Sequence, residues 1–294
     1  MLCTRSSQPK TEHRVRPRVL IRADGSETIG FGHLVRSLVL ADALSDLGAE
    51  VQVWGHSVEK AQRLARSLLP LTVSDFPEPA SGPCQVGEIV KFQPDLLLVD
   101  GYQFETDFFL ALESAGVCYG VLDDNGETRA LNPAFVINYN LGADGLGYEE
   151  RFPNSLLLLG EAYFILRKEL RDLVGMPPSR GDSIVVSLGG GEQAELLKKL
   201  LRTIPPQFNQ VIVSPATTAE FRSFAAIASG EQYSLNRVEP RNFIIALAET
   251  QHAILAGGTS LGEALALNKS VFATVVADNQ MRPVMSAYER GNLA

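Results

Sequence analysis

Short apolar runs alternate with amphipathic patterns along the whole chain. In the first half the apolar runs predict strands at residues 18–23 (RVLIRA), 50–54 (EVQVW), 71–74 (LTVS), 96–100 (LLLVD), 118–122 (CYGVL) and 135–140 (FVINYN). The segments between them predict helices near residues 33–47, 57–68, 84–93 and 104–115. Continuous apolar strands separated by helices indicate βαβ units and parallel sheets that are buried on both faces.

The second half of the chain repeats this pattern. Strands are predicted within SIVVSLGGG, NQVIVSP, HAILAGG and VFATVVA, and helices near residues 192–203, 217–228, 240–250 and 260–267. Between the halves, ELRDLVGMPPSRGD carries the glycine and proline residues of a linker.

The pattern therefore predicts an α/β protein with two Rossmann-like, doubly wound domains. The expected map is an arm at 1–14, a first domain at 15–165, a linker at 166–181 and a second domain at 182–294. Ligands of such sheets bind at the carboxyl ends of the strands, so we expect the site in a central cleft that the two domains face.

Composition narrows the class of partner. The chain has 294 residues, of which 45% are hydrophobic and 20% charged, and its net charge is −8. This acidic balance argues against nucleic-acid binding, the apolar runs are too short for membrane insertion, and the N-terminus lacks a signal-peptide pattern. Cys3, Cys84 and Cys118 are scattered, so neither a disulfide framework nor a zinc site is expected. We expect a cytoplasmic protein without a metal or cofactor; its oligomeric state stays open.

The first strand-to-helix connection, RADGSETIGFGHLVR, holds the first candidate chemistry. Gly30 and Gly32 precede His33, but Val35 stands where a dinucleotide-binding fingerprint requires glycine. His33 alone among the four histidines combines a glycine-rich turn with a helix N-terminus. The positive end of a helix disfavours imidazolium, so His33 is suited to accept a proton from water. The alternative is a tight turn in which His33 caps or packs. Arg36 either orients the ring, contacts substrate or forms a surface or linker salt bridge.

Acidic residues follow two further predicted strands. Asp100 and Tyr102 lie at the end of LLLVD, and Asp123 and Asp124 follow CYGVL. The paired aspartates could be general acid and base, although neighbours on a strand face opposite sides. Asp-Asp-Asn-Gly is also typical turn chemistry, so both interpretations stay open.

The second domain carries a candidate anion site in AILAGGTSLGEALAL. Backbone N–H groups at Gly258, Thr259 and Ser260 suit a diphosphate, and Glu263 lies one turn further along the same helix, where it could accept hydrogen bonds from ribose hydroxyls. The alternative is a glycine turn capped by Ser260.

Two neutral amides follow the last predicted strand. Asn279 and Gln280 suit sugar hydroxyls or acetamido groups, or they cap the next helix.

Taken together, IRADG, IGFGHLVRSLVLA, VDGY, LDD, INYN, LLGEAYFILRKE, VSLGGG, AGGTSLGEAL and NQ resemble, in order and spacing, the UDP-sugar hydrolase family of pseudaminic acid biosynthesis. That family cleaves UDP-2,4-diacetamido-2,4,6-trideoxy-altropyranose, and the spore-coat polysaccharide proteins are similar to it. The resemblance covers nearly the whole chain after the arm.

The resemblance implies a glycosyltransferase-B architecture, akin to the murein N-acetylglucosaminyltransferase, and metal-independent hydrolysis at the anomeric carbon with release of UDP. It implies catalytic roles for His33, which would activate water, and for Tyr102. Contacts with the UDP-sugar are expected from Asp24, Gly30, Gly32, Arg36, Gly258, Thr259, Ser260, Glu263, Asn279 and Gln280.

Two departures from the family pattern concern the identity of the sugar. GGGEQ stands where relatives often carry G-G-x-D, and DDNGETRALNP has an Asn-Gly pair at a position that varies. The rival functions are a glycosyltransferase of the same fold, for which the sequence shows no acceptor-binding patch, and a non-catalytic nucleotide-sugar binder, which would not need His33.

Overall fold

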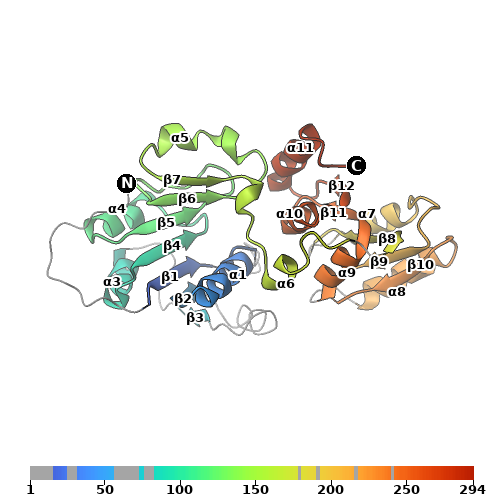
Figure 1. Ribbon diagram of the computed structural model, residues 1–294, viewed down its shortest axis with the longest axis horizontal. Helices are drawn as coiled ribbons and strands as arrows, with labels where there is room; N and C mark the ends of the chain where they lie inside the picture. Colours follow the sequence, from blue (N-terminus) through green and yellow to red (C-terminus); the bar gives the residue numbers. More distant parts are fainter. Residues whose placement is uncertain are drawn as a thin grey trace. The chain divides into compact units, whose positions relative to one another are not determined.

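The computed structural model describes residues 16–24, 32–55, 73–75, 83–177, 180–189, 193–214, 218–239 and 242–294. The chain divides between Arg167 and Lys168 into two compact units, each built on its own parallel sheet (Figure 1). The predicted arm at 1–14, the predicted helix at 57–68 and Gly30 lie outside the described residues.

The first unit contains seven described strands, all in parallel pairs. Its elements are β1 (Arg18–Ala23), α1 (Gly32–Asp46), β2 (Glu50–Gly55), β3 (Val73–Asp75), α3 (Pro83–Phe92), β4 (Leu96–Asp100), α4 (Thr106–Ser114), β5 (Tyr119–Leu122), β6 (Phe135–Asn138), α5 (Tyr148–Arg151) and β7 (Leu156–Leu159), with 3-10 turns η1 (Ala143–Leu146) and η2 (Glu161–Tyr163).

The second unit contains five described strands, also all parallel. Its elements are α6 (Lys168–Arg171), β8 (Arg180–Ser187), α7 (Ala194–Leu201), β9 (Gln210–Val213), α8 (Thr218–Ala228), β10 (Ser234–Arg237), α9 (Phe243–Glu249), β11 (Thr250–Ala256), α10 (Thr259–Ala266), β12 (Ser270–Thr274), the 3-10 turn η4 (Asp278–Gln280) and α11 (Met281–Glu289).

Both sheets reverse their winding direction at one point. The first sheet has the order β3-β2-β1-β4-β5-β6-β7 and the second β10-β9-β8-β11-β12. The chain therefore moves outward from β1 and then returns to place β4 on the other side of β1; β8 and β11 repeat this in the second unit. Ligands of open α/β sheets bind at the carboxyl ends of the strands at such a reversal.

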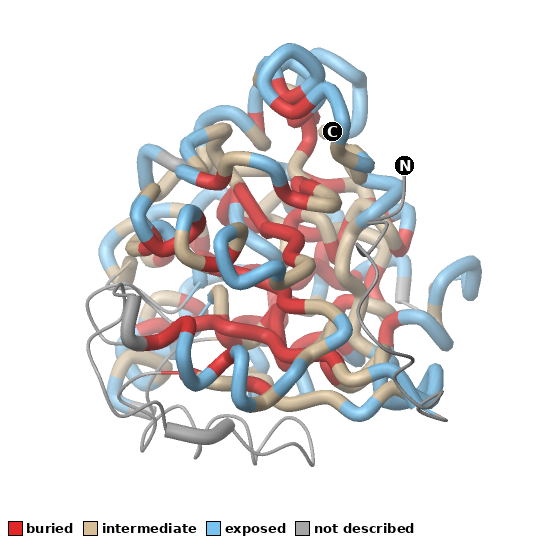
Figure 2. The backbone as a smooth tube through the Cα atoms, turned by 90° about the vertical axis from the view of Figure 1, so that its left-hand side faces the viewer, coloured by how far each residue is buried: buried red, intermediate tan, exposed pale blue. Residues whose placement is uncertain are grey.

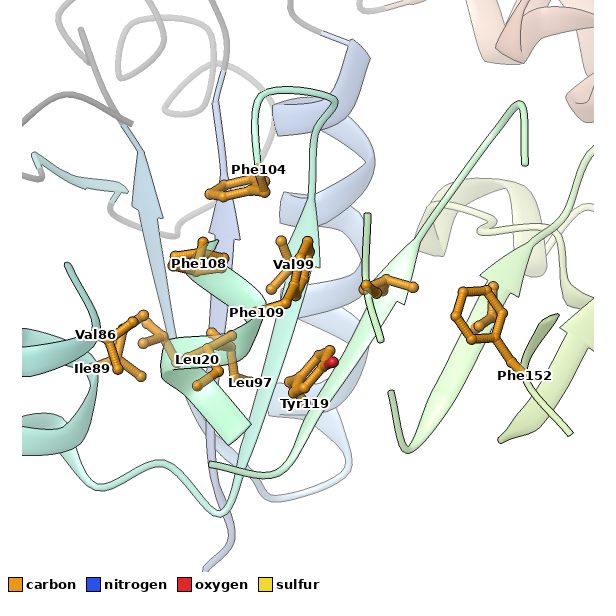
Figure 3. Packing of buried hydrophobic residues seen from close by; sticks show 14 of the residues in the cluster. Leu20, Val86, Ile89, Leu97, Val99, Phe104, Phe108, Phe109, Tyr119 and Phe152 are labelled. Carbon is orange, nitrogen blue, oxygen red and sulfur yellow. The ribbon is translucent and has the colours of Figure 1, made fainter. Parts of the chain in front are cut away.

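Apolar side chains cover both faces of the first sheet, as continuous apolar strands require. Leu20 and Val99 pack with Phe108 and the other α4 side chains on one face (Figure 3), whereas Ile21 and Leu38 belong to the cluster on the other face. The central strands β1, β4 and β5 are almost entirely buried, and Figure 2 shows the buried segments in the interior with exposed segments around them. The second unit has its own core between β8, β9, α7 and α8. The prediction of two doubly wound α/β domains is confirmed.

Several elements differ from the sequence prediction, which gave no residue range for a helix at α5 or α11. β7 and β10 were not predicted: four leucines in a row do not distinguish a strand from a helix, and SLNR has a single apolar residue. Both are edge strands, which need little apolar surface. The segment predicted as a linker contains α6, whose Leu170 is fully buried and which packs against α9. This burial makes α6 part of the second unit.

Candidate active site

The strand register brings the predicted site residues of the first unit to one edge of its sheet. Ala23 of β1 pairs with Asp100 of β4, and Asp100 pairs with Leu122 of β5. Asp24, Asp100 and the aspartates after Leu122 therefore emerge side by side at the carboxyl ends of three adjacent strands. Helix α1 starts beside them, since His33 near its N-terminus contacts Asp100.

His33 forms a dyad with Asp100. Its Nδ1 lies 2.7 Å from Asp100 Oδ1, and the Asp100 side chain is fully buried. Arg36 Nη2 lies 2.9 Å from the same nitrogen, so Nδ1 faces both a carboxylate and a guanidinium. In the tautomer that donates to Asp100, the imidazole proton lies on Nδ1, because an ionised carboxylate only accepts hydrogen bonds. No described residue hydrogen-bonds Nε2, which is then the lone-pair nitrogen. This is the arrangement of a general base whose orientation and protonated form are supported by a buried carboxylate.

Arg36 ties the dyad to a second carboxylate. Its Nε donates to Asp100 Oδ2 at 2.8 Å and its Nη2 to Asp100 Oδ1 at 2.5 Å, while Nη1 donates to Asp124 Oδ1 at 2.6 Å. Ser37 Oγ donates to Asp100 Oδ2 at 2.9 Å. Although burial favours the neutral forms of both groups, their attraction holds the pKa of Asp100 at about 2 and raises that of Arg36 well above its usual value. Asp100 is therefore ionised at neutral pH, and Arg36 is a buried ion-pair residue, unlike the surface salt bridge that one interpretation allowed.

Tyr102 reaches both sides of this network. Its hydroxyl donates to Asp124 Oδ2 at 2.8 Å, and its ring meets the His33 imidazole edge to face at a centroid distance of 4.7 Å. Burial and the adjacent Asp124 raise the pKa of the Tyr102 hydroxyl, so it remains a donor at neutral pH. Asn140 Nδ2 also donates a hydrogen bond to Asp124 Oδ1, at 3.1 Å.

The two neighbouring aspartates after β5 have different roles. Asp123 is buried and accepts backbone N–H groups from the four successive residues 125–128, which is the turn role that the Asp-Asp-Asn-Gly sequence favoured. Asp124 alone faces Arg36 and Tyr102. Because the two carboxylates are bound by different partners and only Asp124 joins the network, an Asp123–Asp124 acid–base pair is wrong.

Asp24 is held inside the protein rather than presented outward. Arg22 Nη1 and Nη2 donate to its two carboxylate oxygens at 2.5 Å and 3.1 Å, and Gln103 Nε2 donates to Oδ2 at 2.6 Å. Gly32 opens α1 at an exposed position, and a Cβ there would meet nothing within 4 Å. Packing inside the protein therefore does not require glycine at position 32.

The second unit brings together a glycine turn and Gln280. Gly258 is the N-cap of α10, so it supplies no side chain to the N–H groups of the first helical turn, which begins with Thr259 and Ser260. A Cβ on Gly257 would lie 2.5 Å from Val284 Cγ2 and 3.0 Å from Gln280 Cβ, so the turn runs directly against the start of α11.

The remaining predicted residues of the second unit differ in how they are placed. Gln280 Oε1 accepts the Val276 N–H at 3.1 Å, and a Cβ on Gly258 would lie 3.9 Å from Gln280 Nε2. Glu263 is buried within α10. Asn279 lies in η4, but its side chain is outside the described residues, as are residues 190–192 of GGGEQ.

Sequence reasoning assigned no site role to Tyr139 or Asn140, noted Asp100 only as a residue at a strand end, and considered Asp124 only as half of an acid–base pair. Asp100, Asp124 and Tyr139 contact Arg36, and Asn140 contacts Asp124. Tyr139 accepts from Arg36 Nη1 at 3.1 Å, and burial raises the pKa of its hydroxyl to about 12. One signal was available for all four: each ends or closely follows a strand, where parallel sheets gather polar groups at one edge. Which of them would turn toward His33 depended on the register.

Two absences concern the described part of the chain. There, no group of three or more His, Cys, Asp or Glu side chains could hold a metal ion. Within the same ranges, no helix is long and apolar enough to cross a membrane.

The fold defines the class: a protein of two Rossmann-like α/β domains with the glycosyltransferase-B fold. UDP-GlcNAc 2-epimerase from Neisseria meningitidis, solved bound to UDP-GlcNAc, matches with a TM-score of 0.54 and 12% identity over 91% of this chain and 85% of that one. Phytolacca americana UGT2, complexed with UDP-2fluoro-glucose and pterostilbene, matches with a TM-score of 0.59 and 14% identity over 92% and 83%.

A curated relative is similar along most of its length. The chain is 22% identical over 267 residues to the UDP-2,4-diacetamido-2,4,6-trideoxy-beta-L-altropyranose hydrolase of Campylobacter jejuni. The aligned residues cover 90% of this chain and 93% of that protein. No family model matches the chain.

Proposed function

We propose that this protein hydrolyses a UDP-linked diacetamido-trideoxy sugar at the anomeric carbon, without a metal, and releases UDP and the free sugar for synthesis of a pseudaminic-type acid. The observation that carries the proposal is the His33–Asp100 dyad at the winding reversal of the first sheet. The similarity to the Campylobacter jejuni hydrolase supports the substrate class.

The chemistry is a single displacement by water. Nε2 of His33 accepts a proton from water while the water oxygen bonds to the anomeric carbon, and the bond from that carbon to the diphosphate oxygen breaks. Asp100 stabilises the imidazolium that forms, as a buried carboxylate does in histidine-based catalysis. Direct attack by water inverts the anomeric configuration, because water enters opposite the leaving group.

The cluster around His33 can balance the proton that His33 receives in this step. Arg36 pairs with two carboxylates, those of Asp100 and Asp124, so the ionised cluster carries one net negative charge while His33 is neutral. The proton taken from water brings the cluster to neutrality.

The second unit is assigned the UDP end of the substrate. The backbone N–H groups of Gly258, Thr259 and Ser260 at the start of α10 suit a diphosphate, which would also gain from the helix dipole. Glu263 would accept from ribose hydroxyls, and Asn279 and Gln280 would face the nucleotide or sugar amides. Gly30, Gly32 and Arg36 keep their expected role near the sugar diphosphate as part of this proposal. Asp24, whose carboxylate is held by Arg22 and Gln103, is given no contact with the substrate.

Product analysis tests the proposal against its rivals. The purified full chain is incubated with UDP-2,4-diacetamido-2,4,6-trideoxy-β-L-altropyranose and related UDP-diacetamido sugars, with no acceptor and with a chelator present. We expect free UDP together with free sugar of inverted configuration.

Each rival gives a different product. A glycosyltransferase would release UDP together with a glycosylated acceptor, and only when an acceptor is added. An epimerase would convert the UDP-sugar without releasing UDP. A nucleotide-sugar binder would leave the substrate unchanged.

A further inference from the structure

Arg22 breaks the apolar pattern of β1. Leu20, on the same face of the strand, belongs to the core, yet Arg22 is fully buried beside it. Its guanidinium pairs with Asp24 through both oxygens, and its Nε donates to Gln85 Oε1 at 3.3 Å. A buried ion pair is rarely worth more to stability than the apolar residues that could replace it. Stability therefore does not explain why β1 carries this pair.

The segment 101–104, which follows β4, is attached to this pair at two residues. Gln103 Nε2 donates to Asp24 Oδ2 at 2.6 Å, and the Phe104 ring lies under the Arg22 guanidinium at 5.3 Å from its centroid. Phe104 is buried at the loop end of the apolar cluster (Figure 3). Gly101 and Tyr102 lie between β4 and these anchors. Tyr102 is half exposed and contacts His33 and Asp124.

Gly101 makes this path possible. Its φ is +154°, and a Cβ on it would collide with the side-chain amide of Gln103. The Gln103 side chain therefore folds back over Gly101 to reach Asp24, which leaves Tyr102 directed toward His33.

We propose that the buried Arg22–Asp24 pair is a positioning element that holds Tyr102 against His33 by anchoring Gln103 and Phe104. Asp24 then acts on the site through the segment 101–104 instead of by touching the substrate. The effect of this ion pair on turnover rests on the proposed function. Its effect on the surroundings of the His33 ring does not.

The test compares two glutamines that contact the same ion pair. Gln103→Met removes the link to segment 101–104. The matched control Gln85→Met removes the hydrogen bond that Arg22 Nε donates to Gln85, a residue outside that segment. Tyr102→Leu serves as the reference for complete loss of the ring contact. The readout is the imidazole ¹H–¹⁵N correlation spectrum of the substrate-free full chain, in which four histidines give a small set of signals.

We expect Gln103→Met to move the His33 signals toward their positions in Tyr102→Leu, and Gln85→Met to leave them near those of the wild type. Turnover of a verified UDP-sugar should fall by up to about 100-fold in Gln103→Met, the scale of an ångström-sized misplacement. The double variant Arg22→Met/Asp24→Leu replaces both charges by apolar side chains and should reproduce the His33 change while remaining folded.

The positioning role is wrong if the His33 signals of Gln103→Met and of the double variant match the wild type, or if Gln85→Met moves them equally. It is also wrong if Tyr102→Leu leaves them unmoved. Because the spectra need no substrate, they remain decisive even if no UDP-sugar is hydrolysed.

Discussion

The two units present different chemistry at equivalent places in their sheets. At the β1–β4 reversal, ionisable side chains form a connected network in which His33, Arg36, Asp100 and Asp124 contact one another. At the β8–β11 reversal, the described groups are a glycine turn, the backbone of a helix start and the amide of Gln280. The same fold can thus supply proton transfer from side chains at one edge and anion binding from backbone at the other.

This comparison predicts that substitutions in the two units will separate turnover from UDP affinity. The largest effect is expected for Asp100→Asn, which removes the partner that keeps the His33 proton on Nδ1. Turnover of a verified UDP-sugar should fall by about 10²- to 10⁴-fold, the range of general-base catalysis, while calorimetry shows unchanged UDP affinity.

Asp123→Asn is the matched control for that variant. It makes the same chemical change at the next strand, on a side chain that accepts backbone N–H groups instead of contacting the dyad. It should lower the unfolding temperature but leave turnover close to that of the wild type. Equal turnover losses in both variants would remove the special role of Asp100.

In the second unit, Glu263→Ala should produce the opposite separation. If its carboxylate accepts the ribose hydroxyls, UDP affinity should fall by about 1.5–3 kcal/mol, the range for a hydrogen bond to a charged group. Calorimetry without a divalent metal measures this directly. Unchanged affinity in a folded variant would exclude the ribose role of Glu263.

Adjacent glycines in the same turn should differ in their structural cost. Gly257→Ala places a methyl group 2.5 Å from Val284 Cγ2, and overpacking of this kind costs about 1–3 kcal/mol of unfolding free energy. Gly258→Ala meets only Gln280 Nε2 at 3.9 Å and should cost much less. Denaturant unfolding of the two variants checks the difference, and equal costs would contradict the close approach of α11 to Gly257.

The acid stability of the first unit should depend on Asp100. Its pKa is lowered from 3.8 to about 2 in the folded protein, so its ion pairs stabilise the fold above pH 4 and this contribution is lost as the pH falls toward 2. The loss amounts to about 2 kcal/mol from the size of the shift. Between pH 4 and pH 2, the free energy of unfolding should decline more steeply in the wild type than in Asp100→Asn. Parallel declines would mean that Asp100 does not contribute this acid-sensitive stability.

The sequence predicted the sheets well because their strands are short apolar runs between turn-forming residues. It failed for β7 and β10, where composition does not distinguish an edge strand. Among the site residues, the glycine-rich turn before α1 identified His33. The partner of His33 was not predictable, since Asp100 is 67 positions away and meets it only through the register of β1 with β4.

Asp123 and Asp124 also show that the sequence does not predict which partners a polar side chain meets. Their sequence was compatible with a turn and with an acid–base pair, and the structure divides them between a turn and the Arg36 network. Arg36 itself was assigned three possible roles, because a position one turn into a helix does not specify which carboxylates lie opposite it.

The most direct measurement compares wild type and His33→Ala on one verified UDP-sugar, with UDP release and UDP affinity determined on the same preparations. We predict that His33→Ala releases UDP about 10²- to 10⁴-fold more slowly and binds UDP as tightly as the wild type, because the proposed base lies in the first unit and the proposed anion site in the second. A variant that releases UDP at the wild-type rate would show that His33 is structural and that the dyad does not perform the reaction.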